Sequence, residues 1–208
     1  MPIGKIYSAP SIQFTPVLNA GLKWEELDRR DQDGFRGLGE KIKLPIGYRL
    51  YKFTEARYDM KPTGRVTPWW SPFDRFRFDT GLQARLQAAR HEAVDPAAKT
   101  RAVAAVRKNW NQLTHILTAR LLKEVYCFWG ECGWQPFEGG ADIETYRRFD
   151  AVMKELARGA PHQTIDHKVH GFMGGASQFL IPGLIRNTHI ARGVFVPVAN
   201  VIAGLQIF

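Results

Sequence analysis

The sequence predicts an α+β fold in which helices separate two groups of short strands. Aromatic and aliphatic residues from Tyr48 to Phe53 predict a first strand, and residues 65–70 predict a second. Apolar residues then recur at helical spacing through the middle of the chain, and strand-like apolar runs return after Gly159. This order is expected when helices are inserted between the two halves of one sheet.

Two helix starts lie in the middle of the chain. Asp79 or Thr80 caps a helix that is expected to run to His91. Asp95-Pro96 starts a second helix, because Asp caps the N-terminus and Pro fits the first turn. Apolar residues three or four positions apart extend this second pattern, and they are Val103, Val106, Trp110, Leu113, Leu117 and Leu121. The sequence therefore predicts one long helix, which the next glycines end.

The last third of the chain is expected to turn from helix back to strand. Asp142 caps a third predicted helix, and Gly159 ends it. Short apolar runs beyond it predict strands at 179–181, at Ile190, at 193–197 and at 201–202.

The composition changes near residue 46, and this predicts how the chain is divided. Residues 1–45 are rich in Gly, Pro and polar residues and have weak periodicity, so they form either a leader or a segment that wraps the main fold. Residues 46–208 are predicted to form the main domain, which is large enough to bury a hydrophobic core of its own.

The composition fits a folded protein that favours anions. The chain is 45% hydrophobic and 24% charged, which excludes wholesale disorder. Its net charge of +9 is spread along the sequence, and it suits a nucleotide, a nucleic acid or an anionic membrane. No signal-peptide pattern and no run of about 18 apolar residues is present. We expect no membrane association, and either a cytoplasmic location or export without a cleaved signal.

An arginine in the first predicted strand is the first candidate site residue. Arg49 follows Tyr48 in an otherwise apolar strand. Its planar guanidinium suits a pyrophosphate or a carboxylate. The alternative is an edge-strand arginine that points to solvent.

A tryptophan pair before a serine is the second candidate. Trp69-Trp70-Ser71 brings two indoles into a short strand, where neighbouring side chains point to opposite faces. We therefore expect only one indole to line a given pocket, where it would stack on a nicotinamide or adenine ring. Ser71 would hold the neighbouring ribose or the arginine. The alternative is one core tryptophan and one exposed tryptophan.

A glycine-rich turn before an amide is the third candidate. Gly174 and Gly175 allow positive φ and close backbone approach, and Gln178 follows in the next predicted strand. The amide both donates and accepts, so it suits a ribose diol. The alternative is a tight turn that only leads into the strand.

Histidines and cysteines give weaker signals. His162, His167 and His170 lie close to Asp166, but their spacing fits no zinc pattern, so no metal is predicted. Cys127 with a distant histidine is a candidate thiol hydrolase pair, although its aromatic neighbours favour a buried, unreactive and reduced cysteine.

Taken in order, the three motifs resemble those of the ADP-ribosyltransferase superfamily. An aromatic-Arg strand, a later strand ending in Ser71, and a Gly-Gly-x-x-Gln turn into a strand are most similar to its NAD-glycohydrolase branch of bacterial toxins. The resemblance covers residues 46–200 by order and spacing. It implies a split β-sheet core with helices inserted between its halves. Leu180 stands where a Gln-x-Glu motif would have its glutamate, which favours hydrolysis over transfer to a protein side chain.

The resemblance implies NAD as the substrate and a role for each motif. Arg49 would bind the nicotinamide-side phosphate, and Ser71 would support Arg49 or the ribose. Gln178 would hydrogen-bond the ribose as the glycosidic bond breaks, through an oxocarbenium-like state. Tyr48, the tryptophan pair, Gly174 and Gly175 would contribute to NAD binding. A delivered effector of this kind would meet a macromolecular acceptor or water, and a neutralising immunity protein.

Two other function classes fit the same sequence. A basic effector directed at nucleic acid would bind in a strongly salt-dependent way. A structural or adaptor protein would carry no chemistry, and polar residues in apolar strands disfavour that class.

Overall fold

A computed structural model describes residues 16–56, 64–92, 95–106, 110–136, 171–172 and 174–202 of the chain. Its elements in chain order are η1 (Trp24–Glu26), α1 (Arg29–Gln32), β1 (Glu40–Leu44), β2 (Arg49–Thr54), β3 (Trp69–Pro72), α2 (Gly81–His91), α3 (Pro96–Val103), β4 (His115–Leu121), β5 (Val125–Glu131), β6 (Gln135–Pro136), β7 (Gly171–Phe172), β8 (Ser177–Leu180), β9 (Ile190–Pro197) and α5 (Val198–Ile202).

Seven of these strands form one antiparallel sheet, and it is nearly divided in two. The strand order is β1-β5-β8-β3-β2-β4-β9. Strands β2 and β4 pair at six positions, whereas the short strand β3 pairs at only two with each neighbour. With β2 these are Leu50 with Pro72 and Tyr51 with Ser71. We call β1-β5-β8-β3 the first half-sheet and β2-β4-β9 the second. The α+β class predicted from the sequence is confirmed.

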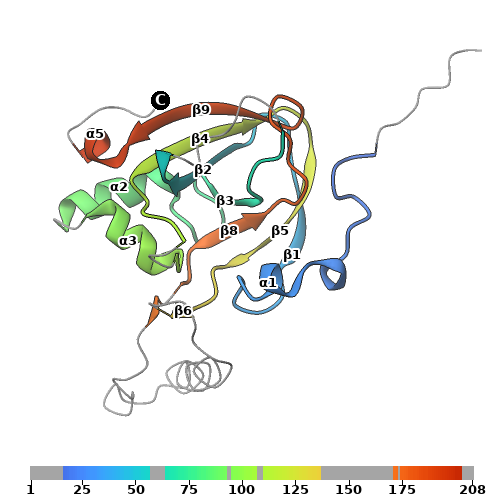
Figure 1. Cartoon of the computed structure of the whole chain (residues 1–208), viewed down its shortest axis with the longest axis horizontal. Helices are drawn as coiled ribbons and strands as arrows, with labels where there is room; N and C mark the ends of the chain where they lie inside the picture. Colours follow the sequence, from blue (N-terminus) through green and yellow to red (C-terminus); the bar gives the residue numbers. More distant parts are fainter. Residues whose placement is uncertain are drawn as a thin grey trace, which may run out of the picture.

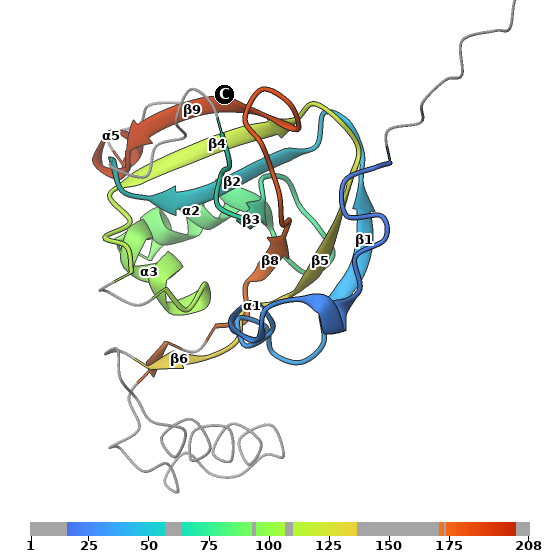
Figure 2. The same cartoon turned by 45° about the vertical axis from the view of Figure 1, so that its right-hand side comes forward.

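The helices cover different parts of the sheet. In Figures 1 and 2, α2 and α3 lie together beneath the second half-sheet, and α1 lies beside β1 at the other side of the molecule. The helix starts predicted at Thr80 and Asp95 are confirmed, and the Asp95 carboxylate accepts a hydrogen bond from the Ala97 amide at 3.0 Å. Helices α2 and α3 follow β3 and precede β4 in the chain, and each half-sheet contains strands from before and after them.

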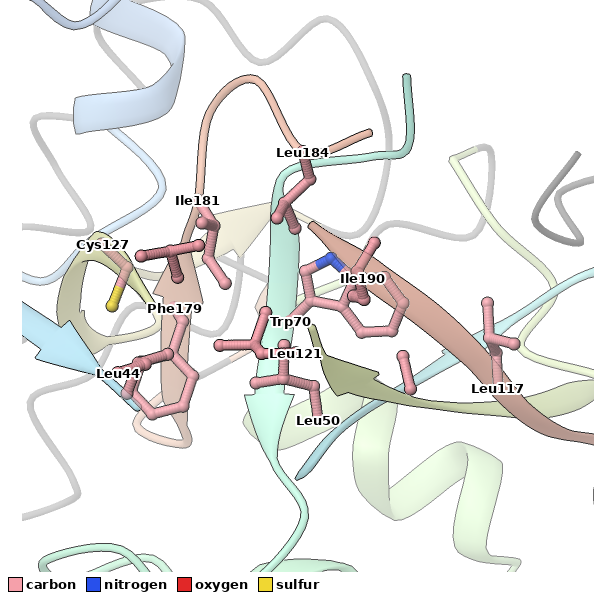
Figure 3. Packing of buried hydrophobic residues seen from close by; sticks show 12 residues of the cluster. Leu44, Leu50, Trp70, Leu117, Leu121, Cys127, Phe179, Ile181, Leu184 and Ile190 are labelled. Carbon is pink, nitrogen blue, oxygen red and sulfur yellow. The ribbon is translucent and has the colours of Figure 1, made fainter. Parts of the chain in front are cut away.

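Three apolar clusters hold these layers together. The largest joins both half-sheets, and Trp70 lies at its centre between Leu50 and Ile190 (Figure 3). A second cluster packs Leu82 and Leu86 of α2 under the second half-sheet. The third packs the segment before β1 against the first half-sheet, and its buried members are Leu27, Phe35, Phe128 and Leu180.

The long helix predicted after Pro96 is wrong beyond Val103. Residues 115–121 form β4, and residues 125–131 form β5. Strand β4 pairs with β2 and β9 along its two edges. Leu117, Ala119 and Leu121 pack into the largest cluster on one face and Ile116 into the second cluster on the other, so its residues are almost all buried. A strand buried on both faces shows no alternation, which is why Leu113, Leu117 and Leu121 imitated a helical stripe.

Other predicted elements differ less. The strands predicted near Tyr48, Trp69, Phe179 and Ile190 are present as β2, β3, β8 and β9. The strand predicted at 201–202 is wrong, because Val198–Ile202 form the helix α5. The helix predicted from Asp142 and the histidine cluster at 162–170 lie outside the described residues.

The segment before residue 46 takes part in the main fold where it is described. Strand β1 pairs with β5 along five residue pairs, from Glu40 with Trp129 to Leu44 with Val125. The Asn19 amide donates to the carbonyls of Tyr126 and Pro182 at 3.1 and 3.0 Å. These contacts attach residues 16–44 to the first half-sheet. No helix of the described residues is long and apolar enough to span a membrane.

Candidate functional site

A cavity of about 590 Å³ lies where β2 and β3 separate, and this volume is in the usual range for ligand pockets. Both faces of β2 contribute, through Tyr51 and Phe53 on one side and Lys52 and Thr54 on the other. Strands that stayed paired would close this space. The cavity is therefore a direct consequence of the short β2–β3 pairing.

The described lining of the cavity is cationic and aromatic, and it contains no acid. Its cations are Arg30, Lys52 and Arg65. Its aromatic residues are Tyr51, Phe53, Trp69, Trp70 and Trp110. Among the described lining residues there is no Asp, Glu or His. The cavity therefore favours an anionic ligand that carries flat rings.

Gln178, Gly34 and Trp69 form a fixed group in the cavity wall. The Gln178 Nε2 donates to the Gly34 carbonyl at 2.6 Å, and the same carbonyl accepts from the Gly133 amide at 2.8 Å. A Cβ on Gly34 would lie 2.7 Å from the Trp69 ring, so only glycine fits beneath this indole. The bond from Nε2 to Gly34 fixes the orientation of the Gln178 amide. Its Oε1 is then the atom that can accept a hydrogen bond from a ligand.

Both tryptophans of the pair line the cavity, and the expectation that only one would do so is wrong. Trp69 is half-buried and packs on Phe35 with ring centroids 5.3 Å apart. Trp70 is buried, and its indole donates to the Thr67 carbonyl at 2.9 Å. Opposite faces of a strand reach one cavity here because the cavity passes between the half-sheets. The Lys52 ammonium lies 5.0 Å from the centre of the Trp70 ring.

Ser71 also lines the cavity, and it lies directly opposite Tyr51 where β3 pairs with β2. Four residues predicted for the site (Ser71, Gln178, Trp69 and Trp70) thus come together in one place. The sequence analysis missed Tyr51, although it lies two residues after Arg49 in the same strand. It also missed Gly34, whose role depends on a contact more than 100 residues away along the chain.

Arg49 and Tyr48 lie elsewhere. The Arg49 Nε donates to the Asp74 carboxylate at 3.0 Å, its Nη2 makes an ion pair with the same residue, and its guanidinium lies 4.3 Å from the centre of the Phe73 ring. Half of the Arg49 side chain is exposed, and it is not among the residues that line the large cavity. Tyr48 is partly buried and packs edge-to-face on Phe76 and Phe179, against the largest core cluster.

Gly174 and Gly175 serve the turn before β8. Both have positive φ, at 72° and 94°. A Cβ on Gly174 would collide with the Cys132 carbonyl, and the Gly175 amide donates to that carbonyl at 2.9 Å. Neither glycine is among the lining residues. Their conformation lets the chain turn tightly against the end of β5 and enter the strand that carries Gln178.

The cavity has no activated thiol. Cys132 lines it, and burial raises the pKa of its thiol to about 12, so the sulfur stays protonated near neutral pH. Cys127 is buried in β5, as the sequence analysis expected, although in a strand and not in a helix; burial raises its pKa as well. Both cysteines are free. The described residues contain no group of three or more His, Cys, Asp or Glu side chains that would hold a metal.

These observations limit the chemistry of the described site. Its lining offers no carboxylate, imidazole or thiolate that would act as a general base at neutral pH. It offers instead positive charge, ring surfaces, a fixed amide and hydroxyls. Such a site promotes reactions in which the substrate carries its own good leaving group and the protein orients it.

Comparisons with known proteins add little to this geometry. No family model matches the chain, and no curated protein matches it. A similar solved structure is Rhs1-CT in complex with cognate immunity protein RhsI1, with a TM-score of 0.38 and 12% identity, covering 78% of this chain and 83% of that chain. A likeness this weak carries no argument about function, which is therefore inferred from the cavity.

Gly34→Ala is expected to destabilise the protein by about 1–3 kcal/mol, because the new Cβ overlaps the Trp69 ring. Chemical unfolding measures the loss. Gly21→Ala is the matched control, since a Cβ there meets nothing within 4 Å. Adding Trp69→Phe to Gly34→Ala should restore part of the lost stability. Equal stability of the Gly34 and Gly21 variants would contradict the close packing.

Alkaline pH is expected to destabilise the fold through Cys132. Its pKa is raised in the folded state, so the unfolded chain releases the proton first, and stability falls as pH rises above the ordinary thiol value toward about 12. Cys132→Ala should reduce the slope of unfolding free energy against pH, by up to about 1.4 kcal/mol per pH unit. Urea unfolding between about pH 9 and 11 measures this. Identical slopes for the two proteins would refute the assignment.

Proposed function

We propose that this chain is an NAD-consuming enzyme that cleaves the bond between nicotinamide and ribose. One observation carries the proposal: a single cavity combines three cations, five aromatic side chains and a fixed amide, and its described lining has no acid. NAD has the complementary parts, which are two phosphates, two flat rings and two ribose diols.

Each part of NAD has a counterpart in the lining. Arg30, Lys52 and Arg65 would bind the pyrophosphate, because guanidinium and ammonium groups pair with phosphate oxygens. Neither Arg30 nor Arg65 forms an ion pair with another described residue. Trp69 would pack against one of the rings. In this proposal the phosphate-binding role passes from Arg49 to these three cations.

Gln178 would act on the reacting ribose. Its Oε1 accepts a hydrogen bond from a ribose hydroxyl while Gly34 holds Nε2, so the amide is oriented before the substrate arrives. Bond cleavage produces an oxocarbenium-like ribose, and the amide oxygen dipole stabilises that positive charge. Nicotinamide leaves as a neutral molecule without a general acid. Ser71 would hold a second ribose hydroxyl.

Water is the proposed acceptor. Leu180, which occupies the place of a glutamate in a transferase Gln-x-Glu motif, is fully buried in the core with Phe128. A carboxylate that activates a protein acceptor is thus missing at this position. Hydrolysis requires only that a water reach the open face of the ribose. Transfer to a protein or nucleic-acid acceptor remains the second form of the same chemistry.

We further propose an ADP-ribosyltransferase-like core and an effector role. The two half-sheets with α2 and α3 inserted between β3 and β4 support that kind of core. An enzyme that destroys NAD harms the cell that makes it, so such an effector would need a neutralising immunity protein and would act in the cytosol of a target cell.

Purified protein is expected to release nicotinamide from NAD, and Gln178→Ala should lower kcat about 10²- to 10³-fold, because a preorganised polar group is lost. Gln87→Ala is the matched control, since this exposed glutamine lies on α2 outside the cavity. Melting temperatures verify folding. Nicotinamide release by the wild type and undiminished release by the Gln178 variant would reject the assignment of this residue. No release with or without cell lysate would reject NAD cleavage.

Arg65→Ala is expected to raise KM for NAD roughly 10-fold with little change in kcat, because it removes a hydrogen bond to phosphate that is formed equally in the ground and transition states. KM of this variant should also depend less strongly on the salt concentration than KM of the wild type. Arg75→Ala removes the same charge from the surface outside the cavity. Equal KM values for the two variants would show that overall charge, and not the cavity, attracts the substrate.

A further inference from the structure

A buried tyrosine hydroxyl at the cavity has no regular hydrogen bond. Tyr51 is 1% exposed and lines the cavity, and its hydroxyl has no hydrogen-bond partner of regular geometry among the described residues, although Ser71 lies across from it. Buried polar groups are almost always satisfied in folded proteins. A buried and unsatisfied hydroxyl that borders a cavity therefore points to a partner that occupies the cavity.

Ser71 lies directly opposite Tyr51 and is the nearest candidate partner, but the two hydroxyls do not reach regular hydrogen-bond geometry. Arg85 on α2 lies 6.0 Å from the centre of the Tyr51 ring, and its Nη2 donates to Asp79 at 2.8 Å. The Arg85 Nη1 is a donor that a tyrosine hydroxyl could accept from, yet it is itself buried without a partner among the described residues, so it makes no regular hydrogen bond to Tyr51. Thr100, which also lines the cavity and is 4% exposed, has a second buried hydroxyl without a partner among the described residues.

Asp79 and Arg85 fix this region from the protein side. Asp79 is buried, and its carboxylate accepts from the amides of Gly81 at 2.8 Å and Ser177 at 3.1 Å as well as from Arg85. These bonds join the start of α2 to the start of β8, the strand of Gln178. The Tyr51 ring is thus held among fixed neighbours while its hydroxyl has no regular hydrogen-bond partner among the described residues.

The Tyr51 hydroxyl is neutral at every physiological pH. Burial raises its pKa to about 12, so the group donates a proton in a hydrogen bond and does not serve as a base. It belongs to β2 of the second half-sheet, whereas Gln178 and Ser71 belong to the first. A ligand that bonds to Tyr51 and Gln178 would therefore bridge the two halves.

We propose that Tyr51 is a ligand-binding residue whose hydroxyl donates a hydrogen bond to an oxygen of the NAD ribose or carboxamide. The identity of the ligand rests on the proposed function, whereas the assignment of a ligand bond to this hydroxyl rests on its burial and its missing partner. The hydroxyl completes the site from the side opposite Gln178. Its contribution appears only when the ligand is bound.

Tyr51→Phe tests this, because it removes the hydroxyl and leaves the ring. The probe is carba-NAD, an analogue that is not cleaved because a methylene replaces the oxygen of the nicotinamide ribose ring. Calorimetry is expected to give binding about 5- to 20-fold weaker than that of the wild type. The melting temperature of the empty variant should equal or exceed that of the wild type, because an unsatisfied buried group is lost. Tyr126→Phe is the matched control outside the cavity, and it should change neither the affinity for carba-NAD nor the melting temperature.

Three outcomes would overturn the inference. If Tyr51→Phe binds carba-NAD as tightly as the wild type does, the role of Tyr51 is overturned. The proposed NAD cleavage still stands in that case, provided that the wild type releases nicotinamide. Weaker binding with a lowered melting temperature overturns it as well, because the hydroxyl then stabilises the empty protein through an internal bond. A wild type that neither binds carba-NAD nor releases nicotinamide overturns this inference and the proposed function together.

Discussion

The arrangement of this molecule depends on two residue pairs that join its half-sheets. Strands β2 and β3 pair only through Leu50 with Pro72 and Tyr51 with Ser71, and they then separate. So short a pairing would be weak by itself, and the buried Asp79 carboxylate supports it from below by joining α2 to β8. Leaving the Arg85 charge without this carboxylate would cost about 3–5 kcal/mol, because a buried charge would lose its counter-ion. The cavity is thus defined by the separation of β2 from β3 and by the Asp79 bonds that hold α2 and β8 together beside it.

A gap in a sheet exposes backbone and side chains from both faces, and the rest of the chain covers them. The segment before β1 forms one wall through Arg30 and Gly34, and the residues at and after the end of α3 form another. Gly34 links these layers, since its carbonyl binds Gln178 and Gly133 while Trp69 lies over its Cα. The N-terminal segment is therefore part of the site, and a protein that began at residue 46 would lack that wall and the edge strand β1.

Several residues singled out in the sequence line the candidate cavity, whereas one of the strands around it was predicted as helix. Trp69, Ser71 and Gln178 were predictable because polar or ring-bearing groups in short strands have few structural uses. Arg49 was not placed correctly by its motif, because alternation along a strand gives the face of a residue but not the end at which two strands part. Strand β4 was taken for helix since burial on both faces removes the period of two. Contacts such as that between Gly34 and Gln178 leave no local pattern in the sequence.

The absence of acids in the described lining, set beside its cations, has a consequence for the proposed cleavage of NAD. Positive charge from Arg30, Lys52 and Arg65 attracts a dinucleotide but opposes a developing ribosyl cation, so these groups help most when they lie at the phosphates and away from the reacting carbon. In the proposed complex the pyrophosphate would neutralise them on binding. The ribose would be left to neutral oxygen dipoles, chiefly that of Gln178, which would stabilise positive charge without a proton transfer. A carboxylate at the reacting end would stabilise the cation more strongly, yet it would also pair with the nearby cations in the empty cavity. A neutral amide avoids this competition and keeps the cationic end open to the substrate.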